Sequence, residues 1–152
     1  MSEKIEEIVE MDIALSATLH TGFDEAVKRT REALAQQGFG VLTEIDVKAT
    51  LKAKLDEDME DYLILGACNP PLAHRAIEAT RQIGTLLPCN VVVRSDPEKA
   101  GTTVVEAMNP RLLADVTGEP KLAPIADEVT GRIQAVIDEL QRSDKAAERS
   151  QA

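Results

Sequence analysis

A continuously apolar run from Tyr62 to Cys68 constrains the fold of this 152-residue chain more than any other feature. A run without polar alternation is typical of a central strand that is buried on both faces. Asn69-Pro70-Pro71 follows at once, and Asn is a strong helix N-cap while Pro is favoured in the first helical turn. The chain therefore passes directly from a buried strand into a helix, which requires helices packed on a sheet.

Hydrophobic periodicity predicts further strands and helices on both sides of this unit. The predicted strands are 11–19, 40–45, 62–68, 90–94 and 102–107. The predicted helices are 21–38, 46–55, 69–84, 109–118 and 125–140. The order β-α-β-α-β-α-β-β-α-α favours an α/β (α+β) two-layer sandwich, in which helices pack on a five-stranded mixed sheet.

The chain length fits one domain, which we place at residues 8–142. Residues 1–7 and 143–152 are polar and charged without hydrophobic periodicity, so we expect both to be flexible ends.

Charge and composition exclude several classes of partner. The chain has 17 Lys and Arg against 27 Asp and Glu, a formal net charge of -10, and it contains one Tyr, two Phe and no Trp. An acidic chain with so few aromatic residues repels phosphate backbones and lacks a base-stacking platform, so we expect no nucleic-acid partner. The apolar runs are shorter than the ~20 residues of a membrane span, and the acidic N-terminus is unlike a secretory signal. We expect a cytoplasmic protein without membrane contact.

Cys68 is the most informative candidate side chain. It stands where a strand meets a helix N-terminus, and the N–H groups of that terminus favour a thiolate. Such a cysteine serves as a nucleophile, a soft-metal ligand or a redox sensor, or it is a small buried apolar residue. Cys89 begins the fourth predicted strand. If the intervening helix crosses between parallel strands, it separates the thiols by ~18 Å. This exceeds the roughly 4.4–6.8 Å between Cα atoms in a disulfide, so we predict two free thiols.

Other catalytic and metal-binding patterns are weak or missing in the sequence. His20 and His74 are the only histidines and follow no familiar zinc spacing, so the sequence predicts no metal site. Glu44, Asp46 and Glu106 could serve as paired carboxylates for proton transfer only if the fold brings them together. The motifs of serine hydrolases, phosphate-binding loops and zinc proteases do not occur.

Four short stretches carry a resemblance to a known family. They are Gly38-Phe39-Gly40-Val41, Ile45-Asp46-Val47-Lys48, Gly66-Ala67-Cys68-Asn69-Pro70 and Leu87-Pro88-Cys89-Asn90-Val91. With these stretches, residues 11–140 resemble the small prokaryotic family called domain of unknown function 302. The resemblance implies a compact α/β fold and a homodimer but no reaction. It directs attention to the two cysteine-containing stretches, while the tail 144–152 lies outside the family pattern.

Three functional hypotheses follow from the sequence. The first is a small-molecule or cofactor-binding module with its pocket near the Cys68-Asn69-Pro70 turn, where Cys89 and Asn90 are further candidate ligand-site residues; the sequence names no cofactor. The second is a thiol-dependent enzyme or redox sensor that uses Cys68, with Cys89. The third is a structural or interaction protein whose acidic surface meets a basic partner.

Overall fold

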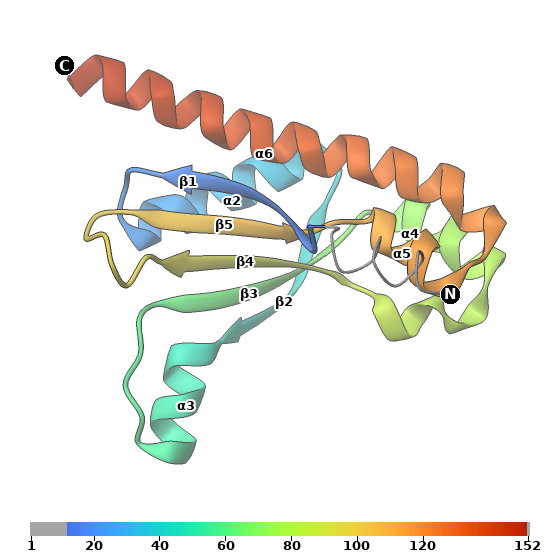
Figure 1. Cartoon of the computed structure of the whole chain (residues 1–152), viewed down its shortest axis with the longest axis horizontal. Coiled ribbons are helices and arrows are strands. Elements are labelled where there is room, and N and C mark those ends of the chain that lie inside the picture. Colours follow the sequence, from blue (N-terminus) through green and yellow to red (C-terminus); the bar gives the residue numbers. More distant parts are fainter. Residues whose placement is uncertain (1–11, 152) are drawn as a thin grey trace.

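The computed structural model describes residues 12–151 (Figure 1). Its strands and helices follow the order expected from the sequence, with two short 3-10 turns added. In chain order they are β1 (Ala14–Leu19), α2 (Phe23–Gln36), β2 (Gly40–Asp46), α3 (Val47–Leu55), β3 (Tyr62–Cys68), α4 (Pro70–Ala79), η1 (Arg81–Leu86), β4 (Cys89–Ser95), β5 (Thr103–Met108), α5 (Arg111–Thr117), η2 (Pro120–Leu122) and α6 (Ala123–Gln151). The expected start of the first strand at Met11 and the expected flexible end 1–7 lie outside the described residues.

The five strands form one sheet in the order β1-β5-β4-β3-β2, and every neighbouring pair is antiparallel. The expected mixed sheet is therefore wrong, although the layered arrangement of helices on a sheet is confirmed. The error lies in α4, which the sequence suggested as a crossover helix. The helix ends at Ala79, and η1 returns the chain to the same end of the sheet, so that Cys89 pairs with Ala67.

The core lies between one face of the sheet and the helical layer. Side chains that alternate along each strand face the helices and are buried, as Cys89, Val91 and Val93 are in β4. The residues between them, such as Val92 and Arg94, are half-buried on the opposite face, which we call the open face. Burial in β3 alternates in the same way up to Leu65, so this strand is fully buried on one face only, contrary to the sequence-based expectation.

Helix α6 runs along the sheet from the end near α4 and α5 to the opposite end of the molecule (Figure 1). Its core stripe is buried as the sequence predicts, through Ile125, Val129, Ile133, Val136, Ile137 and Leu140. The helix continues to Gln151, beyond the end expected near Leu140 and into the stretch 143–152 that was expected to be flexible. The next inward position is Asp144, whose side chain is only 2% exposed. Because this buried position is occupied by a carboxylate and not by an apolar residue, hydrophobic periodicity does not predict that the helix continues past Leu140.

Strand β2 and helix α3 project from the far edge of the sheet (Figure 1). Asp46 caps α3 as predicted, since its side chain accepts a hydrogen bond of 2.9 Å from the backbone N–H of Ala49. None of the α3 residues is buried. None of the helices within residues 12–151 is long and apolar enough to cross a membrane.

Candidate functional site

A pocket lies where β3 ends and β4 begins, between the sheet and helices α4, α5 and α6. The pocket is partly open to solvent and has a volume of about 40 Å³. Its lining is almost entirely apolar and comes from several separate segments of the chain: Phe39, Ala67, Cys68, Asn69, Leu72, Ala73, Ala76, Leu87, Pro88, Cys89, Leu113, Ile125 and Val129. We call this site the cysteine pocket, because both cysteines of the chain line it.

Antiparallel pairing is the reason that the two cysteines share one pocket. Ala67 pairs with Cys89 across β3 and β4, and Cys68 is the next residue of β3. The expectation that the thiols lie at opposite ends of the sheet is therefore wrong. Both thiols are free; Cys68 is half-buried and Cys89 is buried.

Burial controls the chemistry of Cys89. It raises the pKa of the Cys89 thiol to about 11, and the neighbouring Cys68 adds to the effect. The cause is that a buried thiolate loses its hydration in apolar surroundings. Cys89 is therefore protonated at neutral pH and unsuited to act as a nucleophile. Only Cys68 remains as a candidate reactive thiol.

This difference predicts unequal labelling of the two cysteines. Iodoacetamide at about pH 7 is expected to modify Cys68 of the native protein first, because raising the pKa of Cys89 from 9.0 to about 11 lowers its thiolate fraction about 100-fold. Peptide mass spectrometry over time measures the two rates separately. In the urea-unfolded chain, both cysteines should react at similar rates. Native Cys89 labelling as fast as in the unfolded chain would contradict the buried position.

Asn69 holds the strand-to-helix turn that forms one wall of the pocket. Its Oδ1 accepts a hydrogen bond of 3.4 Å from the backbone N–H of Leu72, and its Nδ2 donates one of 3.4 Å to the carbonyl oxygen of Gln37. The first bond caps α4, as the sequence predicts, and the second ties the turn to the segment before β2. Both ends of the amide are used within the protein, so its contribution to the site is positional.

The remaining sequence candidates lie apart from the pocket lining. Pro70 is exposed at the start of α4, and Asn90 is exposed on the open face. Glu44 and Glu106 bind different arginines: Glu44 pairs with Arg31, and Glu106 with Arg94 at 2.6 Å.

The third carboxylate of that sequence-based group, Asp46, caps α3. The structure therefore does not assemble Glu44, Asp46 and Glu106 into one proton-transfer site.

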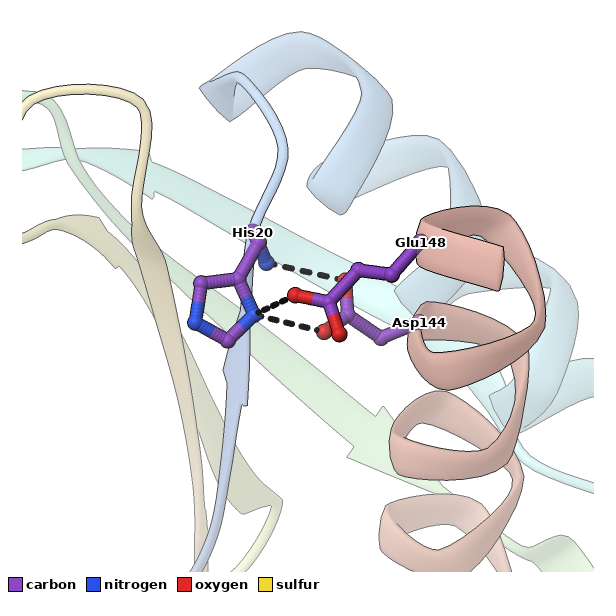
Figure 2. Close-up of side chains that lie close together, drawn as sticks. All are labelled: His20, Asp144 and Glu148. Atoms are coloured by element: carbon purple, nitrogen blue, oxygen red, sulfur yellow. Dashed lines mark hydrogen bonds and ion pairs between the residues drawn. The ribbon is translucent and has the colours of Figure 1, made fainter. Parts of the chain in front are cut away.

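A second cluster of titratable side chains, His20, Asp144 and Glu148, is shown in Figure 2. It lies at the other end of the sheet, where Leu19 of β1 pairs with Thr103 of β5. His20 directly follows β1, while Asp144 and Glu148 stand one turn apart on α6. The His20 Nδ1 lies 2.9 Å from Asp144 Oδ2 and 2.8 Å from Glu148 Oε1. The backbone N–H of His20 donates a further hydrogen bond of 2.8 Å to Asp144 Oδ1.

The two carboxylates alter the acid–base behaviour of the histidine. The hydrogen bond to Asp144, followed by the charge of Glu148, raises the pKa of His20 above its usual value. Sequence reasoning missed this cluster because 124 residues separate His20 from Asp144. The sequence contains one indication of the cluster: Leu140, Asp144 and Glu148 continue the four-residue interval of the core stripe, which places both carboxylates on the face of α6 that packs on the sheet.

Comparison with known proteins agrees with the fold. The family model for the domain of unknown function DUF302 matches residues 15–140. The chain is also similar to the crystal structure of an uncharacterized conserved DUF302 protein from Bacillus stearothermophilus, with 31% sequence identity and a TM-score of 0.78. That similarity covers 86% of this chain and 99% of the other. No curated protein matches the chain. Because the family model spans most of its length, this chain belongs to the DUF302 family.

Proposed function

We propose that the protein is a binding module that holds a small apolar molecule, or the apolar end of a larger one, in the cysteine pocket. The observation that carries this proposal is the partly open, apolar pocket between sheet and helices, at the turn that follows β3. Apolar surface with few polar groups is typical of ligand pockets. Because the Asn69 amide is already bonded to backbone groups, the lining offers a ligand hydrocarbon contacts and two thiols.

The size of the pocket limits the ligand. About 40 Å³ is far below the roughly 300–1,000 Å³ of pockets that enclose drug-sized ligands. A methyl-sized or similarly compact group fits without rearrangement, and a ring requires a wall to move. We assign that movement to Leu87 and Pro88, which are half-buried and lie between η1 and β4. Ile125 and Val129, which also line the pocket, belong to the buried stripe of α6 and are less free to move.

A pocket-filling variant tests the proposal. Ala73 lines the pocket and is half-buried, so Ala73→Leu is expected to occupy the space and abolish binding. The probes are benzene, indole and short-chain alcohols, added to the reduced wild-type chain. A probe present at about 100 times its Kd should stabilise the wild-type protein by about 2.7 kcal/mol in thermal unfolding.

The matched control is Ala53→Leu on α3, an exposed position far from the cysteine pocket. It is expected to keep the stabilisation by the same probes. The proposal fails if none of the probes shifts wild-type unfolding, or if Ala73→Leu retains the full shift.

Thiol chemistry is the second hypothesis, and it now depends on Cys68 alone. The raised pKa of Cys89 favours a supporting apolar role for that residue. The labelling experiment above decides whether Cys68 is reactive in the native chain.

We also propose that the protein is a cytoplasmic homodimer. Two free thiols in a chain of this size fit a reducing compartment. The open face supports self-association, because apolar residues such as Ile64, Val92 and Val104 are only half-buried there and Ile13 beside it is 72% exposed. Native mass spectrometry of the protein as purified reports the oligomer and any carried ligand together; a mass of one chain would contradict the dimer.

A further inference from the structure

We propose that His20, Asp144 and Glu148 form a binding site for a divalent transition-metal ion, with Zn²⁺ as the best-matched ion. The site lies at the opposite end of the sheet from the cysteine pocket and is independent of the proposed ligand there. It also replaces the sequence-based expectation of no metal site. Asp144 and Glu148 lie beyond residues 15–140, which the family model matches.

The first argument is the convergence of ligand atoms. One nitrogen of His20 and one oxygen each of Asp144 and Glu148 all lie within 4.8 Å of one another. They come from two elements that are far apart in the sequence, and all three point into the same space (Figure 2). An imidazole nitrogen with carboxylate oxygens is a ligand set that suits zinc and its neighbours.

The second argument is charge. His20 Nδ1 carries at most one proton, yet it faces two carboxylate oxygens at 2.9 and 2.8 Å. An imidazolium leaves the cluster with one net negative charge, whereas a divalent ion bound to neutral imidazole and two carboxylates makes it neutral. Among residues 12–151, Lys99 is the other charged group that acts on His20, and it does so more weakly than Asp144 and Glu148.

The third argument is that one ligand is fixed while the others can adjust. Asp144 is 2% exposed, and the backbone N–H of His20 holds its Oδ1, which leaves Oδ2 directed at the ring nitrogen. Zinc bonds of about 2.0–2.2 Å in a tetrahedral site place ligand atoms about 3.3 Å apart. The observed separations from Nδ1 are about half an ångström shorter. His20 and Glu148 are 52% and 49% exposed, so their side chains can make this adjustment.

Exposure also leaves room for a water molecule as the fourth ligand. Three protein ligands and one water form the pattern of an open zinc site. The ion would join the end of β1 to the last turns of α6, which the sequence alone gave no reason to order. Binding is therefore expected to stabilise this part of α6 as well as to create an accessible metal centre.

The test is a calorimetric titration of the reduced full chain with zinc chloride. The buffer contains no chelator or phosphate and is held at about pH 8, because the metal must displace a proton from His20. One ion is expected to bind per chain. His20→Gln and Glu148→Gln are expected to raise the Kd at least about 10-fold. Circular dichroism should show native helix content in both variants, since both side chains are about half exposed.

Two controls separate this site from other zinc ligands. His74 pairs with Glu78 at 3.2 Å on the exposed surface of α4, so His74→Gln removes a histidine–carboxylate pair outside the cluster and should leave the Kd unchanged. Cys68→Ser removes the half-buried thiol and should also leave it unchanged. The proposal is overturned if wild type shows no saturable binding below about 100 μM. It is equally overturned if His20→Gln binds as tightly as His74→Gln.

Discussion

An Ile133→Asp chain is expected to be unable to fold stably. Ile133 lies at the centre of the buried stripe of α6 and is 0% exposed. The substitution removes a large apolar side chain and places a carboxylate where burial strongly opposes its charge. A loss of more than about 4–5 kcal/mol is expected from this combination. That loss is comparable to the whole stability of an ordinary domain, about 5–15 kcal/mol.

Urea unfolding followed by circular dichroism measures this effect, and the neighbouring residue supplies the control. Gln134 is exposed on the same helix, so Gln134→Asp introduces the same charge without burying it. Its unfolding midpoint should lie only slightly below that of wild type, because the substitution replaces the hydrogen bond of 2.9 Å from Gln134 to Asp138 with a like-charge pair that costs about 0.2–0.5 kcal/mol. Ile133→Val, which removes one methylene from the core, should cost only about 0.5–1.5 kcal/mol. A cooperatively folded Ile133→Asp chain with a wild-type midpoint would show that another face of α6 packs on the sheet.

Features that depend on local interactions could be predicted from the sequence. Periodicity gave the order of the elements and the buried stripe of α6, because these patterns repeat within a few residues. The turn at Asn69 is also local, since the side chain caps a helix three residues ahead. Asn109 holds a related turn at the same end of the sheet, although it does not cap α5: its Oδ1 accepts a hydrogen bond from the backbone N–H of Arg111, two residues ahead, and its Nδ2 donates one to the carbonyl oxygen of Asp12.

Features that depend on distant pairings could not be predicted in this way. Strands β3 and β4 are antiparallel because α4 and η1 return the chain to the end of the sheet at which β3 ended. The spacing of apolar residues does not show to which end a connection returns. Because parallel strands were expected, Cys68 and Cys89 were also expected to lie far apart, whereas they line the same pocket.

The His20–Asp144 contact was missed for a related reason. The inward position after Leu140 is a carboxylate, and burial of a carboxylate becomes understandable only once its partner across 124 residues is known.

Gly66→Ala is expected to lower stability by about 1–3 kcal/mol, because a side chain at this position has no space. Strand β2 has a bulge between Val41 and Thr43, and this bulge places Thr43 over Gly66 of β3. A Cβ on Gly66 would overlap Thr43 Oγ1 and lie 2.9 Å from Pro88 Cγ. Urea unfolding provides the measurement. Gly40→Ala in β2 is the matched control, since a Cβ there meets nothing within 4 Å, and it should be nearly neutral.

A second substitution identifies the cause of the Gly66→Ala effect. Thr43→Ala removes the hydroxyl that the new methyl group would overlap, so the double variant should recover part of the lost stability. The coupling between the two substitutions is expected to be about 0.5–3 kcal/mol. Recovery should stay incomplete because the contact with Pro88 remains, and Pro88 also lines the cysteine pocket. Strictly additive effects would contradict this packing. A coupled result would show that the β2 bulge, Gly66 and a wall of the proposed ligand site form one packed unit.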